Sequence, residues 1–465
     1  MKKSFRLLEE KLTASQIIML GFLCVIAVGT LILMMPFCSM DGSMTSWVDA
    51  LFTATTSTCV TGLVTVSTYG HWSMIGKVVI LTLIQIGGLG FMTCFTMMLM
   101  AFGKRVTLRE RMVIQDSLNE TGLTGMVRLV RRMIKGTVCV EGIGALFYMV
   151  KLVPEYGIKG IFYSIFTSVS AFCNAGMDLF GDTSLVRYVH DYYMNVVTMV
   201  LIVLGGLGFT VWWDVLDNLK KARMVNAFKR KPWKVFQKGL SLHTKLVLAA
   251  TVILIGLGAF IIFLAEYNNE ATMAHFTIPQ KLLASIFQSV TTRTAGFQTI
   301  PQENFSISSQ LVSVILMFIG GSSAGTAGGV KTTTIAVIVL MVLSVVRGRE
   351  RTEVFERTIP SNTIRKAFTI TTISAVIVVG ATMLLSVLQP LERAMPLLYE
   401  TVSALATVGL SQGLTGSLTI PAKLLMIVMM FIGRIGPMTM AFAIGTRLKA
   451  AKDNIKYPDE NVLVG

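Results

Sequence analysis

The chain has 465 residues, of which 53% are hydrophobic and only 14% are charged, and its formal net charge is +16. Because a soluble domain has about 25% charged residues, this composition excludes an ordinary soluble protein and indicates a polytopic membrane protein. The positive charge does not indicate nucleic-acid binding, because most of the 41 Lys and Arg residues lie in segments between alternate pairs of apolar stretches.

The apolar stretches predict eight spanning helices in four successive pairs. The first helices of the pairs are expected near residues 13–36, 133–154, 244–266 and 366–389, and the second helices near 74–101, 192–216, 309–346 and 422–446. The first apolar stretch lacks a small-residue cleavage site, so we expect a retained helix and not a signal peptide. The segment before it is amphipathic, and we expect it to lie on the inner membrane surface.

Three basic segments, residues 104–135, 220–245 and 347–366, separate the pairs. Short loops rich in Lys and Arg stay in the cytoplasm, so these segments and both termini are predicted to be cytoplasmic. The six cysteines and four histidines show no spacing typical of a metal site, and disulfide bonds are not expected.

A short stretch rich in Thr, Ser and small residues lies between the two helices of each pair and reaches a glycine followed by an apolar residue. The four copies are LFTATTSTCVTGLVTV from Leu51, IFTSVSAFCNAGMDLF from Ile165, IFQSVTTRTAGFQTI from Ile286 and LYETVSALATVGLSQG from Leu398. A second marker follows each copy: IGGLGF (86–91), LGGLGF (204–209), IGGSSAG (319–325) and IGRIGP (432–437). Two markers in the same order, four times, indicate a repeated unit.

The predicted fold is therefore an all-α membrane protein in which four helix–pore loop–helix repeats surround a central pore. It has eight spanning helices and four short pore helices. The predicted divisions are residues 1–105 (repeat 1 with the N-terminal interfacial segment), 106–219 (repeat 2), 220–350 (repeat 3, with a broken second helix), 351–447 (repeat 4) and 448–465 (a cytoplasmic tail).

The re-entrant stretches are too short to span a membrane, and irregular backbone is tolerated there only where it is buried in protein or lines a watery cavity. Glycine permits the positive φ that the returning chain needs. Carbonyl oxygens from four copies could then replace the water shell of a cation, forming a selectivity filter. The candidate filter residues are Val60, Thr61, Gly62, Asn174, Ala175, Gly176, Thr294, Ala295, Gly296, Thr407, Val408 and Gly409.

The stretch GGSSAGTAGGVKTTT, from Gly320 to Thr334, has the composition of a phosphate-binding loop but not its spacing, because Val330 separates Gly329 from Lys331. Apolar sequence flanks it on both sides, and several glycines make a continuous helix costly. It therefore predicts a break in a membrane helix. The candidate gate residues are Gly320, Gly321, Ser322, Ser323, Gly325, Thr326, Gly328, Gly329, Lys331 and Arg434.

These motifs resemble the TrkH/TrkG/KtrB/HKT superfamily of potassium transporters over residues of about 13 to 447, and the early start of the first repeat is most similar to the bacterial KtrB branch. The resemblance implies potassium uptake through a channel-like pore, since glycine in all four filters accompanies potassium preference in that family. It implies that the glycine-rich break is an intramembrane gate loop with Arg434 nearby. It also implies a homodimer in a bacterial cell membrane, joined to a ring of nucleotide-binding RCK-type, KtrA-like subunits.

Several alternatives stay open at this point. Transport could be passive or a sodium-coupled symport, and a sodium-translocating member of the same superfamily is the main rival. The chain lacks the phosphate-loop spacing that an ATP-hydrolysing enzyme needs. A scaffold protein without transport would not need four filter-like stretches. We expect no enzyme activity and no cofactor other than the transported potassium ion.

Charged residues within the apolar stretches also carry expectations. An intramembrane Arg is costly, so Arg434 is expected to face a cavity or the carbonyls of the broken helix, two compatible roles. Lys331 could extend toward the cytoplasm or take part in gating. We expect Glu141 to make a structural contact between helices, and Arg293 to brace the backbone of the third filter.

Overall fold

The computed structural model describes residues 13–90, 126–181, 183–226 and 238–440, together with residues 93, 94, 96, 112 and 236. The predicted N-terminal surface segment, the tail 448–465 and parts of the first two basic segments lie outside the described residues. Within the described ranges the chain is mostly helical, which confirms the predicted fold class.

The four predicted first helices are all present. They are α2 (Ala14–Leu33), α7 (Met126–Tyr156), α12 (Leu242–Glu266) and α16 (Ser361–Leu388). Each contains a segment that is long and apolar enough to cross a membrane. Hydroxyl residues cap two of them, since the side chain of Thr13 accepts a hydrogen bond at the start of α2 and that of Ser241 does so at the start of α12.

The second helices are shorter than predicted. They are α4 (Met74–Leu89), α9 (Tyr192–Leu207), α14 (Ile307–Phe318) and α18 (Ile420–Ile435). In three repeats the helix ends at the last glycine of the second marker, where φ is +83° at Gly90, +91° at Gly208 and +94° at Gly436. The predicted second helices near 74–101, 192–216 and 422–446 are therefore interrupted at these three positions, because glycine alone adopts such a positive φ readily.

In repeats 2 and 3 a further helix follows the break. After Gly208 the chain continues as α10 (Phe209–Asn226), at 96° to α9. In repeat 3, residues 319–331 separate α14 from α15 (Thr332–Val346), as predicted. By length and composition the described residues contain four spanning helices, or five with the bent pair, so the predicted number of eight stays a prediction.

Four short buried helices lie between the first and second helices. They are α3 (Trp47–Cys59), α8 (Lys159–Cys173), α13 (Ile278–Thr291) and α17 (Ala394–Ala406). The first glycine of the second marker packs against the end of the short helix in three repeats. An added Cβ would lie within 3.0 Å of Thr58 O at Gly87, of Phe172 O at Gly205 and of Leu405 O at Gly433. The re-entrant stretch and the second marker therefore recur together in the sequence because they pack against each other in the fold.

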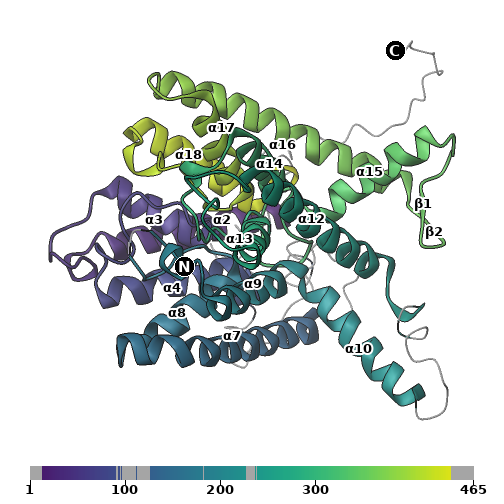
Figure 1. The fold of residues 1–465 in the computed structure, drawn as a ribbon, viewed down its shortest axis with the longest axis horizontal. Helices are drawn as coiled ribbons and strands as arrows, with labels where there is room; N and C mark the ends of the chain where they lie inside the picture. The colour runs from purple at the N-terminus through teal and green to yellow at the C-terminus, as the bar shows by residue number, and fades with distance from the viewer. Residues whose placement is uncertain are drawn as a thin grey trace, which may run out of the picture.

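Four 3₁₀ turns and one hairpin complete the described elements. The turns are η1 (Pro36–Cys38), η2 (Val186–Tyr188), η3 (Gln302–Asn304) and η4 (Thr415–Ser417). Strands β1 (Glu353–Val354) and β2 (Arg357–Thr358) pair antiparallel in the third basic segment, an addition to the predicted all-α fold. Figure 1 shows α10 and this hairpin projecting from the same end of the helix bundle.

Candidate functional site

The four predicted filter glycines meet in one closed ring. A Cβ added to any of them would lie within 3.0 Å of a carbonyl oxygen in the next repeat. The contacts run from Gly62 to Ala175 O, from Gly176 to Ala295 O, from Gly296 to Val408 O and from Gly409 to Thr61 O. The ring therefore brings together backbone from all four repeats with no room for a side chain.

The backbone of the four filters has the same unusual conformation. The glycines have φ of +96°, +64°, +82° and +93° at Gly62, Gly176, Gly296 and Gly409. Two residues before each glycine, a residue with a side chain also has positive φ: Val60 at 57°, Asn174 at 60°, Thr294 at 69° and Thr407 at 51°. Such conformations are uncommon and cost of order 1–3 kcal/mol each, so their fourfold recurrence marks a functional backbone.

Each filter is held by its own short helix. In repeat 1 the amide of Thr61 donates to Thr56 O at 2.8 Å, and the amide of Gly62 donates to Thr56 Oγ1 at 3.0 Å. The first of these bonds recurs at 2.8 Å from Ala175 to Ser170 O and from Val408 to Ser403 O. In repeat 3, whose stretch is one residue shorter, Ala295 donates to Thr291 O at 2.9 Å. These hydrogen bonds use the backbone amides of the filters, so the carbonyl oxygens of the ring are available to bind an ion.

The ring lies between two cavities. The outer cavity, named after the predicted orientation, has a volume of about 400 Å³ and is lined by the four filter glycines and the loops that follow them. The inner cavity has a volume of about 550 Å³ and is lined by Gly325, Gly328, Lys331 and Arg434, among others. Residues of the predicted gate therefore border the inner cavity and are absent from the lining of the outer one.

Residues 319–331, the gate loop, are anchored both internally and to other repeats. Inside the loop, the amide of Gly320 donates to Val330 O at 2.9 Å. Across to α9 of repeat 2, the amide of Ser322 donates to Gly206 O at 2.9 Å. The hydroxyl of Thr326 donates to Phe172 O, at the end of α8, at 3.0 Å. The loop thus lies directly against the second filter.

Repeat 4 holds the other side of the gate loop. Arg434 Nη1 donates to Thr326 O at 2.6 Å, which is the type of contact that the sequence predicted. Arg434 Nη2 also donates to the carbonyls of Gly87 and Gly88 in repeat 1, the second at 3.2 Å, and these partners were not predicted. Lys331 Nζ donates to Ala327 O of its own loop at 2.7 Å, and the side chain also lines the inner cavity.

Two further charged side chains lie beside the filters. Arg293 is buried, and its Nη2 lies 3.5 Å from Thr251 Oγ1 of α12. The role of Arg293 in bracing the filter backbone stays a prediction, since this contact of its guanidinium group reaches α12 and not a filter carbonyl. Glu141 of α7 accepts a hydrogen bond from Gln85 of α4 at 3.1 Å, so the predicted contact between helices is confirmed.

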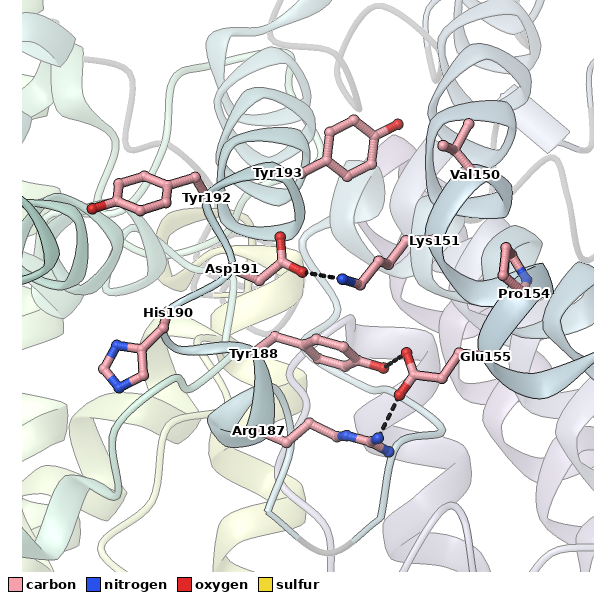
Figure 2. Close-up of a pocket in the computed structure, with 10 residues that line it drawn as sticks. All are labelled: Val150, Lys151, Pro154, Glu155, Arg187, Tyr188, His190, Asp191, Tyr192 and Tyr193. Carbon is pink, nitrogen blue, oxygen red and sulfur yellow. Dashed lines mark hydrogen bonds and ion pairs between the residues drawn. The ribbon is translucent and has the colours of Figure 1, made fainter.

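An open pocket of about 930 Å³ lies beside the loop that follows the second filter (Figure 2). Lys151 Nζ pairs with Asp191 at 2.8 Å, and Glu155 accepts from the hydroxyl of Tyr188 at 2.7 Å and also pairs with Arg187. Burial raises the pKa of Asp191, but the hydrogen bond from Lys151 and backbone amides outweigh it and lower the pKa overall. These pairs hold the loop against α7. Their members are far apart in the sequence, so no sequence pattern indicated that they would meet.

The chain as a whole is similar to known proteins. The TrkH family, described as a cation transport protein, matches residues 11–452. The chain belongs to this family. TrkH-family proteins are ion transporters and not enzymes.

Curated relatives match nearly the full chain. Ktr system potassium uptake protein B of Bacillus subtilis is 40% identical over 98% of this chain and 97% of its own length. The potassium/sodium uptake protein NtpJ of Enterococcus hirae is 38% identical over 100% of this chain and 99% of its own length. The crystal structure of the potassium transporter TrkH from Vibrio parahaemolyticus covers 94% of this chain and 84% of its own, with a TM-score of 0.70 and 18% identity, and shows a common fold.

Proposed function

We propose that this chain is the membrane subunit of a Ktr-type potassium uptake system, in which potassium crosses the ring of filter glycines. The ring carries the proposal, because four backbone segments with the same positive-φ pattern close around one point between two cavities. Backbone carbonyls in such an array can replace the hydration shell of a cation. The names of the B. subtilis and E. hirae relatives support potassium as the substrate, with no resident cofactor.

Sodium is the second candidate ion, as a coupled or stimulating ion or as the main substrate. The word sodium in the name of the E. hirae relative favours including it in every assay. The absence of a Cβ at all four ring positions favours potassium as the main substrate, because a side chain there would displace a carbonyl of the neighbouring repeat.

The gate loop is proposed to obstruct the inner pore and to be displaced when the transporter opens. It borders the inner cavity, and it touches the second filter on one side and repeat 4 on the other. Arg434 would hold the closed position, because it joins the loop to the carbonyls of repeat 1. Lys331 would stabilise the loop through Ala327 O.

We further propose a homodimer in the bacterial cell membrane, with both termini cytoplasmic and a nucleotide-binding RCK-type ring bound on that side. The name Ktr system of two relatives supports a subunit that works with others. We also propose that the four repeats have the boundaries predicted from the sequence. The basic segments and the tail are the proposed docking surface, although attraction to anionic lipid contributes about 1 kcal/mol per Lys or Arg there.

Uptake of rubidium into liposomes, with and without sodium, tests the transport proposal. We expect uptake by the wild-type protein and a weaker potassium preference over sodium in Gly62→Ser, because the added side chain meets Ala175 O. Gly296→Ser should act in the same direction. Unchanged potassium/sodium permeability ratios in both variants would contradict the filter assignment.

The partner proposal is tested by truncating the tail after Thr446 and measuring capture of candidate ring subunits. We expect reduced capture by the truncated protein. Full retention of the partner would remove the tail from the proposed interface.

A further inference from the structure

The third residue of each re-entrant stretch differs among the four repeats in a way that the transport proposal does not use. The residues at this position are Thr53, Thr167, Gln288 and Glu400, and all four are buried, with Glu400 fully so. Only repeat 4 has an ionisable side chain there. The comparison among repeats therefore isolates one carboxyl group beside the fourth filter.

Repeat 3 shows that the structural role of this position needs no charge. Gln288 Nε2 donates to Gln302 Oε1 at 2.7 Å, and Gln302 Nε2 lies 3.3 Å from Gln288 Oε1. This amide pair ties the short helix α13 to the loop after the third filter. In repeat 4 the corresponding contact runs from the hydroxyl of Thr415 to Oε1 of Glu400. Thr415 follows Gly409 at the same sequence distance as Gln302 follows Gly296.

The second oxygen of Glu400 has no partner. Glu400 Oε2 is buried without a hydrogen bond, and none of the ion pairs among the described residues includes Glu400. An ionised carboxylate in such a place is unfavourable unless a cation or a proton neutralises it. One oxygen of this buried carboxyl group is therefore available to a cation or a proton.

The surroundings favour a cation. Thr415 and Ser411 line the outer cavity together with the four filter glycines, and Ser411 also lies beside the Glu400 carboxyl group. Carboxylate and hydroxyl oxygens are ligands that hard cations prefer. A single carboxylate matches a monovalent ion, and the described part of the chain contains no group of three His, Cys, Asp or Glu side chains that could hold a metal.

We propose that Glu400, Thr415 and Ser411 form a sodium site at the side of the outer cavity, separate from the ring of filter glycines. Sodium bound there would neutralise the buried carboxylate and hold the loop after the fourth filter against α17. The inference rests on the proposed function only in that the outer cavity receives monovalent cations. The proposal assigns any stimulation of transport by sodium to the carboxyl group of Glu400, which lies outside the filter.

Thermal unfolding of the purified protein tests the site directly. Potassium is kept at a saturating concentration to occupy the ring, and sodium chloride replaces choline chloride at constant ionic strength. We expect sodium to raise the melting temperature of the wild-type protein and to have no effect on Glu400→Gln, which copies the amide of repeat 3. Glu303→Gln is the matched control, because it removes a carboxylate that lines the outer cavity itself and should keep the response.

Three results would overturn the proposal. A full sodium response in Glu400→Gln places sodium elsewhere, and an equal loss in Glu303→Gln shows that only the cavity charge matters. A wild-type protein that ignores sodium but is stabilised by acid through Glu400 holds a proton there instead. If Glu400→Gln does not fold, Thr415→Val replaces it and should raise the sodium concentration needed by about tenfold, the cost of one hydrogen bond to a charged group.

A measurement of rubidium uptake distinguishes failure of the sodium site from failure of the proposed function. We expect external sodium to stimulate rubidium uptake by the wild-type protein in liposomes, and this stimulation to be lost in Glu400→Gln. Absence of rubidium uptake in the wild-type protein would contradict the proposed function, whereas the melting experiment would still decide whether the site exists.

Discussion

The filter and the gate loop are both irregular backbone inside a helix bundle, but they are held in opposite ways. Amides of each filter bond to the short helix of the same repeat, as Thr61 does to Thr56. The gate loop bonds outward, to Gly206 of repeat 2 and through Arg434 to repeats 4 and 1. A filter can therefore keep its shape while repeats move, whereas movement between repeats breaks the contacts of the gate loop.

The ring should give the largest effect in a test of this comparison. A Cβ at Gly409 would meet Thr61 O of the neighbouring repeat, and φ is +93°. We expect Gly409→Ala to lower rubidium uptake by about 100-fold or more, because the carbonyl ring cannot close. Gly413→Ala is the matched control, since its φ is +84° with nothing within 4 Å of the added atom. Similar losses in both variants would assign the effect to backbone strain alone, which costs about 1–2 kcal/mol.

Releasing the gate loop should have the next largest effect, in the opposite direction. Arg434→Ala removes the bonds to Thr326 O and to Gly87 and Gly88, and hydrogen bonds to charged groups contribute about 1.5–3 kcal/mol each. We expect flux to rise by about tenfold in a potassium-uptake-deficient cell, with looser dependence on the partner.

Deletion of residues 322–326 should also raise flux. The two changes should combine less than additively, because both remove one barrier. A deletion variant that folds and inserts normally but shows level or lower flux would favour a bracing role for the loop.

Two hydroxyl groups of the gate loop distinguish contacts between repeats from contacts within repeat 3. Thr326→Val removes the bond to Phe172 O at 3.0 Å, which links the loop to repeat 2. Ser323→Ala removes a hydroxyl contact to Thr333 of the same repeat at 3.4 Å. Since one neutral hydrogen bond contributes about 1 kcal/mol, we expect flux to rise about fivefold in the first variant and to stay level in the second. Equal effects would contradict the distinction drawn here.

The smallest effect concerns the outer cavity and external pH. Asp178 lines this cavity, accepts hydrogen bonds from Ser184 and Phe180, and has its pKa raised to about 6 by burial. The carboxyl group is ionised above that pH and neutral below it, so acid removes a negative charge that attracts cations. We expect rubidium uptake to fall about twofold as external pH drops through 6, and Asp178→Asn to flatten this dependence. Glu303 is the other carboxylate of the cavity, and Glu303→Gln should keep the pH response.

The amino-acid sequence by itself determined the repeats, the filter glycines and the break in repeat 3. These features depend on local properties, namely apolar length, the tolerance of glycine for positive φ and the recurrence of two markers in a fixed order. The placement of Arg434 beside the loop also followed, because an intramembrane Arg needs acceptors and a broken helix offers them.

The tertiary structure alone decided which groups meet across repeats. In three repeats the first glycine of the second marker packs against the end of the short helix, a contact between segments far apart in sequence. The sequence contained Glu400 and Gln288 at equivalent positions, but only the fold showed that the amide is paired and that one carboxylate oxygen is not. The contact of Arg293 with Thr251 of α12 was not predictable for the same reason, since the partner of a buried side chain depends on which helix the fold brings beside it.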